Sequence, residues 1–130
     1  MKKTALEIYA LAVCLFAVIL FVVCSGIAVY STIQISNPEF TMRSWTYQMY
    51  RSNDVYWDRQ TRYRDRDGKA TARPDEVELT RQRTEAFAEE VMVEKRDGMQ
   101  YLVKSLIVLI LGIVVFLIHW ALARKARSTI

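Results

Sequence analysis

The chain has 130 residues, of which 52% are hydrophobic and 25% are charged, and its formal net charge is +4. That length suffices for one domain at most, and charged residues are absent from two long stretches, residues 8–38 and 105–123. A soluble domain mixes apolar and charged residues along the chain. Their separation here excludes an ordinary soluble domain and predicts a membrane protein.

The positive charge of the chain flanks the apolar stretches. Residues 31–100 carry 12 basic and 13 acidic residues, so this middle segment is close to neutral. The excess positive charge comes from Lys2, Lys3, Lys104, Arg124, Lys125 and Arg127. Basic residues at such positions set the orientation of membrane spans, so we expect a lipid bilayer and no nucleic acid as the partner.

A short basic N-terminus, residues 1–7, precedes the first apolar block at residues 8–30. As a helix these 23 residues are about 34 Å long, which is enough to cross a hydrocarbon core of about 30 Å. A cleaved signal peptide is the alternative, because Gly26 and Ala28 offer small residues at a cleavage spacing. We expect the block to be retained, since signal peptides have only about 7–15 apolar residues.

The middle segment, residues 31–100, is predicted to lie outside the membrane as a pair of helices. An Asn-Pro pair supplies an N-cap and a proline at the first helical position, so a first helix is expected over residues 38–66. A turn is expected near residues 67–73, where Asp67 and Gly68 adjoin, and Pro74 begins a second helix. Together these elements predict an extramembrane helical hairpin.

Aromatic side chains gather in the first helix of this hairpin. The candidates for docking a partner are Trp45, Tyr47, Tyr50, Tyr56 and Trp57. Two alternatives remain open, because these side chains can instead form the contact between the two helices or lie flat in the membrane interface. Exposed aromatic patches are rare on lone domains, so helix–helix contact is favoured over docking.

The second apolar block, residues 101–123, precedes a basic tail at residues 124–130. The two blocks predict an all-α membrane protein with two transmembrane helices in an antiparallel hairpin. Basic residues flank the spans more densely at the termini than in the middle segment, so both termini are expected in the cytoplasm. No Asn-x-Ser/Thr glycosylation sequence occurs, and we expect a bacterial inner membrane.

Small side chains recur at heptad spacing along one face of each apolar block. The predicted transmembrane packing residues are Ala10, Cys14, Ala17, Cys24, Ala28, Ser105 and Gly112. Small side chains let helix backbones approach closely, and such packing drives helix association in lipid. We expect these faces to contact each other, other membrane subunits, or copies of the chain.

Two ionisable side chains, Glu7 and His119, lie on these faces near the same side of the predicted hairpin. An ionisable residue in a span is a functional hypothesis by default. The sequence predicts a contact between the two side chains, direct or through water. The alternative is that each side chain reaches the lipid headgroups independently.

Motifs for catalysis and cofactor binding are missing from the sequence. It has one histidine and no Cys-x-x-Cys motif, so no metal or cofactor site is expected. Asp65, Asp67 and Glu76 have the spacing of an EF-hand, but Ala70 stands where that loop needs glycine. Phosphate-binding loops and nucleophile elbows are absent. We therefore expect no enzymatic activity and no small-molecule substrate.

Two functions fit these expectations. The favoured one is a non-catalytic accessory or scaffold subunit, which associates through its small-residue spans and offers the aromatic-rich hairpin for docking. The alternative is a homo-oligomeric ion channel or transporter with a pore lined by Glu7, Ser105 and His119.

Overall fold

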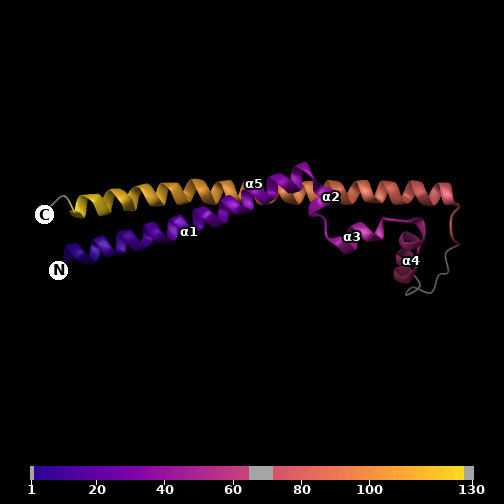
Figure 1. Ribbon diagram of the computed structural model, residues 1–130, viewed down its shortest axis with the longest axis horizontal. Coiled ribbons are helices and arrows are strands. Elements are labelled where there is room, and N and C mark those ends of the chain that lie inside the picture. The colour runs from indigo at the N-terminus through magenta and orange to yellow at the C-terminus, as the bar shows by residue number, and fades with distance from the viewer. Residues whose placement is uncertain (1, 65–71, 128–130) are drawn as a thin grey trace. The chain divides into compact units, whose positions relative to one another are not determined.

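The structure is a computed structural model that describes residues 2–64 and 72–127, and within these ranges every regular element is a helix (Figure 1). The all-helical prediction is therefore confirmed. The helices are α1 (Lys2–Ser36), α2 (Pro38–Thr41), α3 (Ser44–Met49), α4 (Asn53–Arg64) and α5 (Glu76–Arg127).

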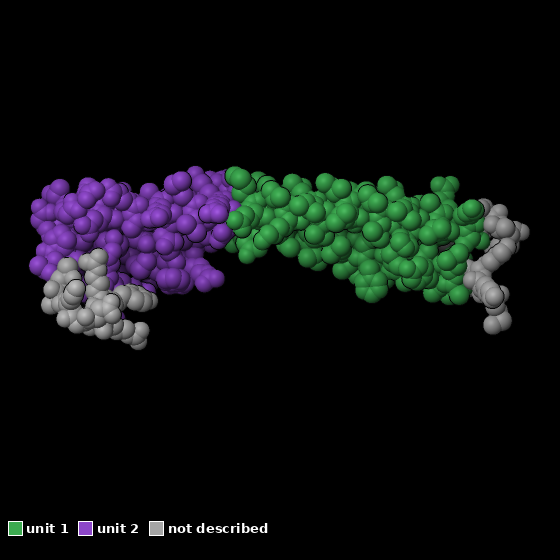
Figure 2. Space-filling model, turned by 180° about the vertical axis from the view of Figure 1, so that it is seen from behind, with its two compact units in different colours: residues 1–32, 98–130 green, residues 33–97 purple. Residues whose placement is uncertain are grey.

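The chain divides into two compact units, which are coloured separately in Figure 2. Unit 1 comprises Met1–Thr32 and Gly98–Ile130, and unit 2 comprises Ile33–Asp97. Both α1 and α5 contribute residues to each unit. The two apolar blocks of the sequence thus fall in unit 1, and most of the charged middle segment falls in unit 2.

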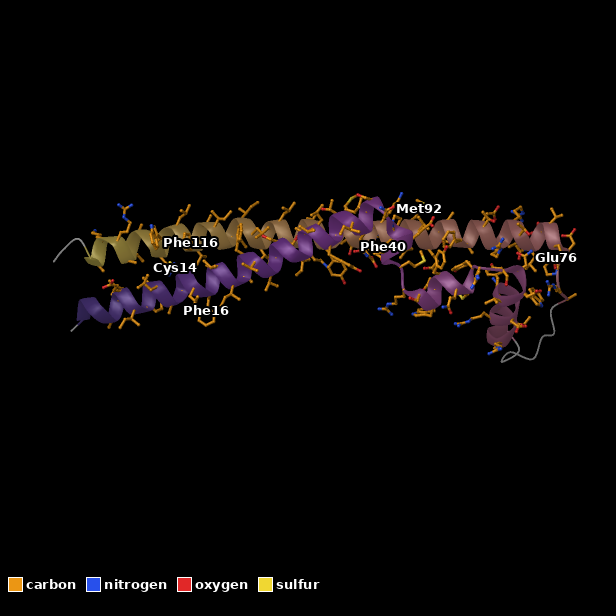
Figure 3. The ribbon with its side chains drawn as sticks, viewed as in Figure 1. Cys14, Phe16, Phe40, Glu76, Met92 and Phe116 are labelled. Carbon is orange, nitrogen blue, oxygen red and sulfur yellow. The ribbon has the colours of Figure 1, made fainter. Side chains whose placement is uncertain are left out.

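Two helical segments are long and apolar enough to cross a membrane, Ala5–Ser36 and Glu76–Ala126. Only 11% of the most apolar window of the first and 6% of that of the second are buried. The core helix of a soluble protein would be mostly buried. Large apolar side chains instead remain uncovered along both segments, as Phe16 does on the side of α1 away from α5 (Figure 3).

Within unit 1, α1 and α5 meet along the face predicted from the heptad spacing. The buried residues of this face are Ala10, Cys14, Ala17, Cys24, Ser31, Ser105 and Ala123. Cys14 faces Phe116, and its thiol lies 3.9 Å from the Phe116 carbonyl oxygen (Figure 3). Tyr9 lies against the ring of His119. These contacts join the beginning of α1 to the end of α5.

The sequence predicted a single helix over residues 38–66 of unit 2, and this prediction is wrong. Three short helices replace it, because the backbone is extended at Met42 and Arg43, where ψ is 141° and 134°. A second break precedes α4, where the Val55 amide donates to the Ser52 hydroxyl at 3.4 Å. Serine and asparagine compete with the helical backbone in this way and favour helix ends.

The first part of α5 also belongs to unit 2. Its first turn is capped by Asp75, whose carboxylate accepts a hydrogen bond of 2.9 Å from the Glu78 amide. Acidic residues in this turn also favour helix formation through the helix dipole. The helix then continues without a break through both predicted segments, residues 75–100 and 101–123. The predicted turn at Asp67 and Gly68 lies outside the described residues.

Candidate functional site

The predicted packing residues of the spans divide by burial in the structure. Four of those in α1 are buried, while Ala28 is half-buried. Ser105 is also buried, and its hydroxyl donates to the Leu102 carbonyl at 2.8 Å, so its polar group is satisfied within α5. The role of these side chains in membrane packing stays a prediction.

A half-open apolar cavity of about 220 Å³ lies in unit 1 beside this face. Its lining consists of Ala17, Val18, Phe21, Gly112, Ile113 and Phe116. A Cβ atom on Gly112 would meet no atom within 4 Å, so no close approach of α1 requires glycine at this position. The small side chain of Ala17 and the absence of a side chain at Gly112 leave this space open instead.

His119 has an aromatic neighbour and a bond within its own helix. Its ring centroid lies 6.0 Å from that of Tyr9, and its Nδ1 lies 2.8 Å from the Val115 carbonyl oxygen. That carbonyl can only accept, so Nδ1 carries the hydrogen when this bond forms. Glu7 is half-buried on α1. The predicted contact between Glu7 and His119 stays a prediction.

Three of the five docking candidates contact other aromatic rings in unit 2. Tyr50 lies 5.6 Å from Phe87 and 5.9 Å from Tyr56, measured between ring centroids, and Tyr47 lies 6.2 Å from Phe87. Tyr56 is buried. These rings hold α3 and α4 against α5. The aromatic side chains thus form a contact between helices, which was the predicted alternative to docking a partner. Trp57 is half-buried, and Trp45 is the most exposed of the five.

A groove of about 280 Å³ borders this aromatic cluster. Its lining consists of Glu39, Tyr47, Tyr50, Arg51, Arg83 and Phe87. Arg83 donates through Nη1 to the Tyr50 carbonyl at 2.6 Å, and this carbonyl stands at the end of α3, where a cation is favourable. The groove therefore combines aromatic walls with two guanidinium groups and one carboxylate.

Burial raises the pKa of Tyr50 to about 12, and the nearby Glu90 carboxylate adds to this effect. The folded chain thus holds the hydroxyl proton more tightly than the unfolded chain, whose tyrosine has the ordinary pKa of about 10. The free energy of unfolding of unit 2 is therefore expected to fall as pH rises from about 10 to 12.

Tyr50→Phe removes the ionisable hydroxyl, so this variant should lose less protection over the same pH range. Hydrogen exchange of peptides from unit 2, followed by mass spectrometry after correction for the intrinsic exchange rate, measures the effect. An equal loss of protection in the two proteins between pH 10 and 12 would show that Tyr50 is not responsible.

A polar network at the start of α5 ties α4 to α5. Asn53 donates through Nδ2 to Glu76 Oε2 at 2.8 Å and to the Thr80 hydroxyl at 2.9 Å. Arg73 bridges Asp54 at 2.7 Å and Glu76 at 2.6 Å. Hydrogen bonds from Asn53 and Arg73 hold the pKa of the Glu76 carboxyl below its ordinary value. This network lies at the surface, and it positions helices rather than forming a cleft for chemistry.

Within residues 2–64 and 72–127, no three metal-ligating side chains come together. Asp65 and Asp67, which share the EF-hand spacing with Glu76, lie outside the described part of the chain. No protein-family model, no curated protein and no solved structure matches this chain.

Proposed function

We propose that the chain is a membrane protein with two transmembrane helices in an antiparallel hairpin. The exposed apolar surface of Ala5–Ser36 and Glu76–Ala126 is the main support for this proposal. Contact of such a surface with lipid is favourable, whereas its contact with water is unfavourable. The contact of Tyr9 with His119 and that of Cys14 with Phe116 support the antiparallel order. Unit 2 is then the extramembrane part.

The proposed location is a bacterial inner membrane, with both termini in the cytoplasm and unit 2 outside. The basic residues at the two termini support this orientation. Trypsin added to sealed spheroplasts should therefore cleave at exposed residues of α4 such as Arg59 and Arg62, while a tag after residue 130 stays intact. In inverted vesicles the tag should be lost. Cleavage of the tag and α4 from the same side would contradict the proposed topology.

The proposed function is that of a non-catalytic accessory or scaffold subunit, and the cavity beside Gly112 is the observation that carries it. The cavity is apolar and half open, so a side chain from another span can fill it. The partner is a second membrane subunit or another copy of the chain. Replacement of Gly112 by a larger side chain tests this function.

The groove of unit 2 supports a docking role outside the membrane. Tyrosine and arginine are enriched where proteins bind each other, and the groove presents Tyr47, Arg51 and Arg83 together. Of the five aromatic docking candidates, only Tyr47 and Tyr50 line this groove. The proposed docking surface is therefore narrower than the predicted one.

The alternative of a homo-oligomeric channel lined by Glu7, Ser105 and His119 stays a prediction. Ser105 and His119 each hydrogen-bond to a carbonyl of α5. These bonds satisfy polar groups within the helix itself, and they favour neither a pore nor a packed interface.

A further inference from the structure

Two exposed aromatic side chains follow the first candidate span closely in the chain. Phe40 of α2, labelled in Figure 3, is 82% exposed, and Trp45 of α3 is 51% exposed. Arg43 lies between them and is also exposed. Met42 and Thr46, in contrast, are buried in unit 2. The segment therefore buries some side chains in unit 2 and leaves two aromatic rings and a guanidinium group exposed.

On the inner side of the same segment, aromatic side chains pack against another aromatic ring of unit 2. Tyr47 and Tyr50 both lie against Phe87. Among the described residues, no ring contact involves Phe40 or Trp45. Each such side chain has about 150–250 Å² of largely apolar surface, and exposure of this surface to water is unfavourable.

Chain length keeps Phe40, where this segment begins, near the membrane surface. The first apolar block of the sequence ends at Tyr30, and α1 continues to Ser36, a rise of about 9 Å. The headgroup layer adds about 5–8 Å to each side of the hydrocarbon core, so α1 ends close to its outer edge. Phe40 is four residues further on, and four residues reach at most about 14 Å.

We propose that α2 and α3 form an interfacial anchor that binds the lipid surface. Phe40 and Trp45 lie at the boundary between acyl chains and headgroups, and Arg43 binds a lipid phosphate. Aromatic side chains concentrate at this depth, and a guanidinium group forms charge-assisted hydrogen bonds with phosphate. Glu39 of α2 lines the groove of unit 2 and is not part of the anchor. This inference rests on the proposed transmembrane hairpin.

The anchor fixes the angle at which unit 2 leaves the membrane. A unit attached only at the ends of two spans can tilt, whereas a third attachment through α2 and α3 holds it at one height. The groove beside Tyr47 then faces partners in a constant orientation, which lowers the orientational cost of docking.

The three tryptophans of the chain, Trp45, Trp57 and Trp120, make the inference testable by fluorescence. Three variants each keep one tryptophan and replace the other two with phenylalanine. Each is reconstituted into phosphatidylcholine vesicles whose acyl chains carry bromine close to the ester end, and bromine quenches only nearby tryptophans. Equal circular dichroism spectra establish that the variants keep their helices.

We expect bromine to reduce the emission of Trp45 and of Trp120 by about twofold or more, as for side chains at the interface, and to leave Trp57 nearly unchanged. If Trp120 is quenched and Trp45 is not, the anchor is wrong while the spans remain. If neither is quenched, the transmembrane proposal itself fails. Protection of an unquenched Trp45 from iodide in water would assign this face to a protein partner instead of lipid.

Two matched substitutions, made in the variant that keeps only Trp45, test the contribution of Phe40 to the anchor. Phe40→Ser should weaken the bromine quenching, because the anchor loses its most exposed apolar side chain. Val77→Ser is the control, since Val77 is 80% exposed at the start of α5, more than 30 residues further along the chain. Equal quenching after both substitutions would overturn the role of Phe40.

Discussion

Replacing Gly112 with leucine is expected to reduce association of the protein with its proposed membrane partner at least tenfold, about 1.4 kcal/mol. Gly112 lines the apolar cavity of unit 1, and a Cβ atom there meets open space. The leucine side chain therefore fills the cavity from within and excludes the partner side chain. Leucine also favours the helix over glycine by up to about 1 kcal/mol, so α5 itself is not weakened.

Gly26 provides the matched control for this substitution. A Cβ atom on Gly26 also meets no atom within 4 Å, and Gly26 does not line the cavity. Gly26→Leu should therefore leave association unchanged. The complex is extracted in mild detergent, and native mass spectrometry measures the fraction of chain that carries a partner. Equal fractions for the two variants would show that the cavity does not receive the partner.

The two candidate spans and their contact face could be predicted from the sequence because helix geometry alone determines them. A long uncharged run can be stable in lipid only as a helix, since every backbone group must bond internally. The spacing of Ala10, Cys14 and Ala17 then places these residues on one face whatever that face meets. The structure buries all three residues.

The breaks between the helices of the middle segment could be predicted from the sequence only in part. Ser52 and Asn53 are typical helix-start residues, so the sequence does carry a signal for the break before α4. At Met42 and Arg43 neither residue type signals an extended backbone. The aromatic rings meet Phe87 from more than 35 positions away in the sequence, and this long-range contact selects the broken path.

The open space around Gly112 could not be predicted from the sequence either. A glycine on a small-residue face predicts a close approach of two backbones. Whether another helix stands opposite depends on the distance between α1 and α5 at that level, which no local pattern encodes. Of the contacts expected for this face, the open space found at Gly112 favours contact with a partner over contact within the chain.

Replacing Leu79 with alanine is expected to be the most destabilising truncation of a single side chain in unit 2. Leu79 has no exposed surface and is the largest fully buried side chain of the described residues. Its neighbours one turn away on α5 both contact the other helices, Glu76 through Asn53 and Arg83 through the Tyr50 carbonyl. Leu79 therefore lies on the face of α5 that holds α3 and α4.

Loss of a buried leucine side chain costs about 2–5 kcal/mol, which combines the lost burial with the cavity that remains. A unit of this size has few other buried apolar side chains to compensate, so α3 and α4 should detach from α5 in a large part of the population. Hydrogen exchange of peptides from α4 measures this opening. Peptides from the spans should keep their protection, because the Leu79 side chain contributes to unit 2 alone.

Val77→Ala is the control for this truncation, because Val77 lies on the same turn of α5 and is almost fully exposed. Its removal should change the opening free energy by no more than about 0.5 kcal/mol. If Leu79→Ala leaves α4 as protected as Val77→Ala does, apolar burial does not hold unit 2 together. The polar network of Asn53, Arg73 and Glu76 would then have to supply its stability, although surface ion pairs contribute only about 0–1 kcal/mol each.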